Sequence, residues 1–105
     1  MVYETNQDLD IALKSYRAAL NIRITLKDTL GLSYCYANIA GIYMMQKKYD
    51  NALKNIFTSL QLREILKDTQ ALAITLNNIG EIYYDKNDPN NALIYFEKSV
   101  ALSGK

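Results

Sequence analysis

The stretch Leu26-Lys27-Asp28-Thr29 returns as Leu66-Lys67-Asp68-Thr69, 40 residues further along the chain. The same interval separates other identical residues: Asp10 and Asp50, Ala12-Leu13-Lys14 and Ala52-Leu53-Lys54, Leu32 and Leu72, and Asn38-Ile39 and Asn78-Ile79. In all, 21 of the 65 residue pairs that are 40 positions apart are identical. A fixed period of about 20 to 50 residues is typical of stacked repeats, in which each unit packs on the next.

Each period contains two segments with the apolar spacing of a helix. Within residues 29–46, Tyr36, Ile39 and Tyr43 recur three or four positions apart, which places them on one side of a helix. The same spacing predicts further helices at 8–26, 50–66, 69–86 and 89–102. The alternating pattern of strands is missing. The sequence therefore predicts an all-α fold of five antiparallel helices with connections of two to four residues.

The predicted breaks between helices carry residues that begin helices. Asp28-Thr29 and Asp68-Thr69 place N-cap residue types where a new helix starts. Asp88-Pro89 places an aspartate before a proline, and proline suits the first helical turn because an N–H group there has no partner within the helix. We therefore expect Asp28, Asp68 and Asp88 to cap three of the helices.

Composition limits the possible functions. The 105 residues suffice for one small domain, and 12 basic against 11 acidic residues give a net charge of +1. Because no basic block stands out, we expect no nucleic-acid partner. The chain has no histidine and no glycine-rich phosphate loop. We therefore expect no enzyme activity, no metal site and no cofactor, and Cys35, the single cysteine, is interpreted as a small buried residue.

The sequence contains no signal for a membrane. No apolar run approaches the roughly 20 residues that span a bilayer. The first ten residues are polar, unlike a secretory signal peptide. The compartment stays open, and a soluble, cytoplasmic protein is the interpretation that the sequence favours.

Residues 36–43, followed by Ala52, Ile56 and Ser59, resemble a tetratricopeptide repeat. That motif has a large residue, Leu-Gly and Tyr on its first helix, and Ala, an aromatic and a small residue on its second. The later copy matches more closely, with Leu76, Ile79-Gly80, Tyr83, Ala92, Phe96 and Ser99. The first copy is incomplete, with matches at Tyr3, Ala12, Tyr16 and Ala19.

The resemblance implies an α-α superhelix, a solenoid of about two and a half repeats. Residues 1–28 would be the C-terminal half of a first repeat, 29–68 a complete second repeat and 69–105 a third. We expect these to be one domain and a fragment of a longer array. The period of 40 exceeds the usual value of about 34, and the proline at the end of each repeat is missing. In this the chain resembles the longer-repeat branch found in kinesin light chains and bacterial peptide-sensing regulators.

The resemblance also implies a ligand surface, because in this family the first helix of each pair lines the concave face of the array. Carried over by position, the second repeat would contribute Tyr34, Ala37, Asn38, Gly41 and Met45, and the third Ile74, Asn77, Asn78, Glu81 and Asp85. An asparagine amide both donates and accepts hydrogen bonds, so it can pair with a peptide backbone. For Asn38 and Asn78 two interpretations stay open, a clamp on a ligand backbone or a hydrogen bond to a neighbouring helix.

The predicted function is a protein-binding or peptide-binding module that uses this concave surface. Glu81 and Asp85 would favour a basic ligand, or would simply form a solvated acidic surface. The alternative is a self-association or assembly scaffold of a larger regulatory or signalling protein. Apolar residues on both terminal helices, such as Ile11, Ile22 and Val100, would then form a homodimer.

Overall fold

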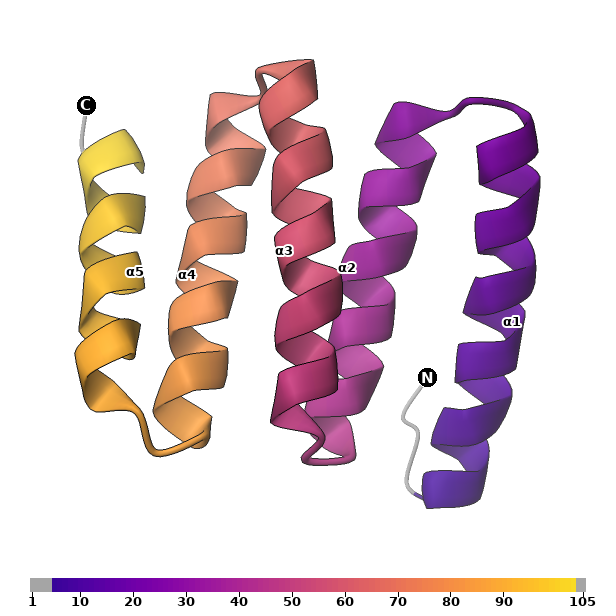
Figure 1. Cartoon of the computed structure of the whole chain (residues 1–105), viewed down its shortest axis with the longest axis horizontal. Helices are drawn as coiled ribbons and strands as arrows, with labels where there is room; N and C mark the ends of the chain where they lie inside the picture. The colour runs from indigo at the N-terminus through magenta and orange to yellow at the C-terminus, as the bar shows by residue number, and fades with distance from the viewer. Residues whose placement is uncertain (1–4, 104–105) are drawn as a thin grey trace.

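The computed structural model describes residues 5–103. Its five helices are α1 (Asn6–Thr25), α2 (Thr29–Met45), α3 (Tyr49–Leu66), α4 (Thr69–Asp85) and α5 (Pro89–Ser103). In Figure 1 they lie in chain order, from indigo α1 to yellow α5, and each runs antiparallel to the helix before it. The all-α prediction is confirmed, and every helix limit lies within two residues of the predicted one. Tyr3, which matches the repeat motif, lies outside the described residues.

The helices pack as pairs. The contacts of α2 with α3 and of α4 with α5 are more extensive than those of α1 with α2 or of α3 with α4. Each of these two pairs spans one 40-residue period of the sequence, and α1 aligns with α3 and α5, the second helices of the two pairs. Stacking in this manner buries one continuous core along the array rather than a single central one.

All four connections use the same turn. Each contains one residue in the left-handed conformation, with φ between 53° and 69°. These residues are Lys27, Lys47, Lys67 and Asn87, at regular intervals of 20. A left-handed residue after a helix lets its last carbonyl groups find backbone N–H partners, and the chain then reverses direction. The regular turn explains why five helices of similar length follow each other in antiparallel order.

The predicted aspartate caps are confirmed. Asp28 accepts a hydrogen bond from the backbone N–H of Gly31 at 2.9 Å, and Asp68 accepts one from Ala71 at 3.1 Å. Asp88 accepts one from the N–H of Asn91 at 3.3 Å. These bonds satisfy N–H groups that have no partner inside the helix. The start of α3 differs, because Lys48 stands at the N-cap and provides no side-chain bond.

The core follows the repeat positions that the motif names. Ile39, Ala52 and Ile79 are buried, and Cys35 is buried as expected. Tyr83 packs against this core and is half-buried, as are Tyr36 and Phe96 of the motif. It stacks on Tyr95 with ring centroids 5.6 Å apart, and burial raises the pKa of its hydroxyl.

A polar link joins successive repeats. The side-chain amide of Gln46 donates to Asp10 Oδ1 at 3.0 Å. In the equivalent place 40 residues later, Lys86 Nζ donates to Asp50 Oδ1 at 2.5 Å. Each link ties the end of a first helix to the start of the preceding second helix. The shared aspartates of the repeat, Asp10 and Asp50, therefore serve the stacking of one helix pair on the next.

Candidate functional site

The ten residues that the family resemblance assigns to a ligand surface are termed the α2–α4 face. They are Tyr34, Ala37, Asn38, Gly41 and Met45 on α2, and Ile74, Asn77, Asn78, Glu81 and Asp85 on α4. Apart from the adjacent pairs Ala37-Asn38 and Asn77-Asn78, they recur three or four residues apart, so each set follows one side of its helix. All are exposed or half-buried. The exposed fraction of Tyr34 is 54%, that of Met45 is 59% and that of Ile74 is 53%, so large apolar groups lie open to solvent.

A hollow of about 270 Å³ lies between α2 and α4 and brings four of these residues together. Ala37 and Gly41 border it from α2, and Asn78 and Glu81 border it from α4. Its other lining residues are apolar: Ala40, Met44, Ile56 and Ile82. Because Ile56 and Ile82 belong to the buried core, the hollow reaches down to the core between the two repeats. An apolar recess with a few polar groups on its edge is the usual form of a binding site.

A second hollow of about 400 Å³ lies between α1 and α2 and contains Tyr34 and Asn38. Arg23 and Asp28 also line it, and their side chains form an ion pair at 2.5 Å. The Gly31 N–H and the Arg23 guanidinium hold the pKa of the Asp28 carboxyl below its usual value, because both favour the charged form. The ring of Tyr34 makes a cation–π contact within the fold, because the Arg63 guanidinium lies 5.2 Å from its centroid.

The remaining members of the α2–α4 face border neither hollow. They are Met45, Ile74, Asn77 and Asp85. Asn77 donates a hydrogen bond to Glu81 Oε1 at 3.1 Å and thereby orients the carboxylate one turn further along α4. The predicted surface is thus divided, with one set of residues around each hollow and four residues outside both.

Asn38 and Asn78 occupy equivalent positions on α2 and α4. Both Asn38 and Asn78 are exposed, and neither side chain forms a hydrogen bond with any residue between positions 5 and 103. Asparagine is an unfavourable residue inside a helix because its amide competes for backbone bonds. The hypothesis that these side chains bond a neighbouring helix therefore has no contact to support it.

Several lining residues were missed by the sequence analysis. Ile56 and Ile82 occupy core positions of the repeat, and their burial gives no sign that one edge faces a hollow. The half-buried Met44 lines the hollow, whereas the exposed Met45, which the repeat position predicts as a site residue, does not. Its adaptable thioether side chain was the available signal.

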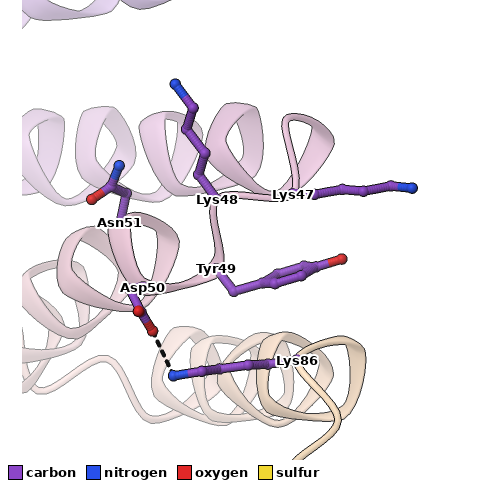
Figure 2. A pocket seen from close by; sticks show the side chains of 6 residues that line it. All are labelled: Lys47, Lys48, Tyr49, Asp50, Asn51 and Lys86. Carbon is purple, nitrogen blue, oxygen red and sulfur yellow. Dashed lines mark hydrogen bonds and ion pairs between the residues drawn. The ribbon is translucent and has the colours of Figure 1, made fainter.

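A third hollow, drawn in Figure 2, lies where the α2–α3 connection meets the end of α4. Three lysines line it, but Lys47 and Lys48 point in different directions and Lys86 reaches toward Asp50. The hydrogen bond to Asp50 raises the pKa of the Lys86 ammonium above its ordinary value. Because the three cations do not converge on one point, this region is best described as part of the link between repeats.

Comparison with known proteins agrees with this architecture. A sequence profile of the tetratricopeptide repeat matches residues 32–105, so the chain belongs to the tetratricopeptide repeat family. Among curated protein sequences none matches the chain. Tetratricopeptide repeats form a class of protein-binding and peptide-binding modules, and this chain is a member of that class.

Two solved structures show the same fold. The apo form of RapI superimposes with a TM-score of 0.83 at 23% sequence identity, over 93% of this chain and 35% of RapI. The N-terminal domain of stress-induced protein-1 (STI-1) from C. elegans gives a TM-score of 0.64 at 16% identity, over 90% of this chain and 86% of that domain. This chain therefore spans about a third of the length of RapI.

No helix within residues 5–103 has the length and apolar character needed to cross a bilayer. That same part of the chain holds no cluster of three or more histidine, cysteine, aspartate or glutamate side chains able to hold a metal ion.

Proposed function

We propose that this chain binds an extended peptide segment of a partner protein on the α2–α4 face. The observation that carries the proposal is the pair of exposed asparagines, Asn38 and Asn78, which make no bond inside the described fold. They lie at equivalent positions of successive repeats, so their amides can pair with backbone groups spaced along one extended chain.

The proposal is tested by panning a random-peptide display library against the chain and against an Asn38→Ala/Asn78→Ala variant. A matched control is Asn21→Ala/Asn90→Ala, which removes two exposed asparagines from α1 and α5. We expect the parent and the control to select one consensus peptide and the Asn38/Asn78 variant to lose it, at equal helix content by circular dichroism. If all three proteins select the same peptide, Asn38 and Asn78 do not clamp its backbone. If the parent selects no peptide, the proposed peptide binding is wrong.

A second candidate function is self-association, and one comparison within the chain favours it. Leu53 on α3 is covered by α4 and keeps 8% of its surface exposed, whereas the equivalent Leu93 on α5 is 58% exposed. A hollow of about 430 Å³ lies beside Leu93 and Val100. An apolar helix face of this kind favours a second copy of the chain.

Light scattering over a range of protein concentrations tests this second candidate. If α5 forms the contact, Leu93→Glu/Val100→Glu lowers the apparent mass to that of a monomer, whereas Lys54→Glu, an exposed substitution on α3, leaves it unchanged. A monomer at high micromolar concentration before any substitution would contradict self-association.

A further inference from the structure

Gly41 is an unfavourable residue at a place where the fold does not require it. It lies inside α2, and glycine is among the least favourable residues in a helix interior. A Cβ atom added at Gly41 would meet nothing within 4 Å beyond its chain neighbours and the backbone of its own helix. The contrast with Gly80 on α4 is direct, because a Cβ there would lie 2.6 Å from Phe96 Cδ1. Packing therefore explains Gly80 and does not explain Gly41.

The empty space at Gly41 is the hollow between α2 and α4. Gly41 lines this hollow, and its equivalent in the next repeat, Glu81, lines it from the opposite side. A side chain at position 41 would therefore project toward Glu81 and would cover the apolar floor that Ile56 and Ile82 form. The missing side chain keeps that floor accessible from outside.

The size of the hollow limits what it can accept. At about 270 Å³ it lies just below the range of about 300 to 1,000 Å³ that is typical of sites for whole small molecules. A single side chain inserted from an extended peptide is a better match than a free metabolite. Because Ile56, Ile82 and Met44 supply the lining, that side chain should be apolar.

The edge of the hollow adds a charge preference. Glu81 is exposed, and Asp85 lies one turn further along the same side of α4. The ion pairs of the described residues are Arg23 with Asp28 and Lys86 with Asp50, so neither Glu81 nor Asp85 is neutralised by a lysine or arginine there. A carboxylate oriented by Asn77 at the edge of an apolar recess favours a cationic group next to the inserted side chain.

We propose that the hollow at Gly41 is a specificity pocket that accepts one apolar side chain of a peptide whose neighbouring residue is lysine or arginine, with Glu81 as the partner of that cation. The inference rests on the proposed peptide binding by the α2–α4 face. It goes further by naming the class of peptide and the residue whose missing side chain makes room for it.

The test uses variants that separate binding from stability. Gly41→Ala should raise the melting temperature, because alanine favours the helix and meets no neighbour. Gly41→Leu should fill the hollow and weaken binding of the library-selected peptide about tenfold or more. The matched control is Ala18→Leu, which adds the same side chain at an exposed site on α1. We expect the control to bind the peptide as the parent does.

The charge preference has its own variant and readout. Glu81→Gln should weaken binding several-fold and should make the remaining affinity less sensitive to salt, because an exposed ion pair is screened by salt. Replacing the basic residue of the selected peptide with glutamine should have the same effect on the parent and little further effect on Glu81→Gln. If the effects of Glu81→Gln and of the peptide replacement are independent, Glu81 is not the partner of the basic residue.

The outcomes distinguish this inference from the function on which it rests. If the parent selects a consensus peptide and Gly41→Leu binds it equally well, the pocket is wrong and peptide binding stands. If the selected peptides lack an apolar residue next to a basic one, the pocket is likewise overturned. If the parent selects no peptide at all, peptide binding and the pocket fail together.

Discussion

The second repeat, α2 with α3, and the third, α4 with α5, build the same helix pair from different residues. Where the second repeat has Ala40 and Ile56, the third has Gly80 and Phe96. The smaller residue on the first helix thus accompanies the larger residue on the second, and the Phe96 ring occupies the space where a Gly80 Cβ would lie. The comparison teaches that the repeat preserves the fit between its two helices, while the individual residues change together.

A second feature is the same in both repeats. The Ser59 hydroxyl donates to the backbone carbonyl of Ser33 at 2.8 Å, and the Ser99 hydroxyl donates to that of Ala73 at 2.7 Å. The acceptor is a main-chain oxygen, so the residue that carries it is free to be serine or alanine. The donor must be a small side chain with a hydroxyl, which explains why serine recurs on the second helix.

The largest expected effect comes from breaking the fit in the third repeat. Gly80→Ala should destabilise the fold by about 1–2 kcal/mol, because overpacking against Phe96 exceeds the gain of about 1 kcal/mol in helix propensity. Urea unfolding followed by circular dichroism measures this change.

The matched test of that fit is the double variant Gly80→Ala/Phe96→Ile, which copies Ala40 and Ile56 of the second repeat. It should recover most of the lost stability, and the two substitutions should be coupled in a double-mutant cycle. A more stable Gly80→Ala single variant would show that the Phe96 ring moves aside without cost.

The next effect concerns the feature that the repeats share. Ser59→Ala should cost about 1 kcal/mol, because it removes a hydrogen bond between two fully buried residues, Ser59 and Ser33. Ser99→Ala should cost less, because 8% of Ser99 is exposed and water can reach the site more readily. Thermal unfolding of both variants measures these losses, with the exposed Ser15→Ala as control, and a larger loss for Ser99→Ala would contradict the prediction.

A smaller effect is expected where the two repeats differ in their connections. Asp88 caps α5, while Lys48 at the equivalent start of α3 makes no capping bond. Lys48→Asp should therefore stabilise the chain by about 0.5–1 kcal/mol. Lys54→Asp, an exposed charge change inside α3, serves as the control in the same melting experiment. An equal gain from both variants would attribute the effect to net charge rather than to capping.

The smallest expected effect is the pH dependence of the stability that Asp28 contributes as the N-cap of α2. Hydrogen bonding to the Gly31 N–H and to Arg23 lowers the pKa of Asp28 from 3.8. A lowered folded-state pKa means that the contribution of this carboxylate is present above pH 3.8 and is lost as the pH falls through the folded value. The difference in melting temperature between the parent and Asp28→Asn should therefore shrink in acid. A difference that is constant with pH would contradict this assignment.

Much of the fold could be predicted because its signals are local. Helix spacing, the capping aspartates and Pro89 each act within a few residues, and the helix limits derived from them lie within two residues of those observed. The degree of burial of Tyr83 could not be predicted in this way, because it depends on the stacked Tyr95 of α5. That contact joins two helices and leaves no mark in the spacing of either one.

The repeat and the helices follow from the periodicity of the sequence alone, and the family and the two sets of candidate ligand positions follow from its resemblance to the tetratricopeptide repeat. The tertiary structure decided which of those positions share a hollow, and that Ile56 and Ile82 form its floor. It also gave the physical difference between Gly41 and Gly80, because a Cβ at Gly80 would meet the Phe96 ring and one at Gly41 would meet no neighbouring helix. The physical reason is that a glycine is required or dispensable according to the distance to atoms of other helices, and only the packed chain sets that distance.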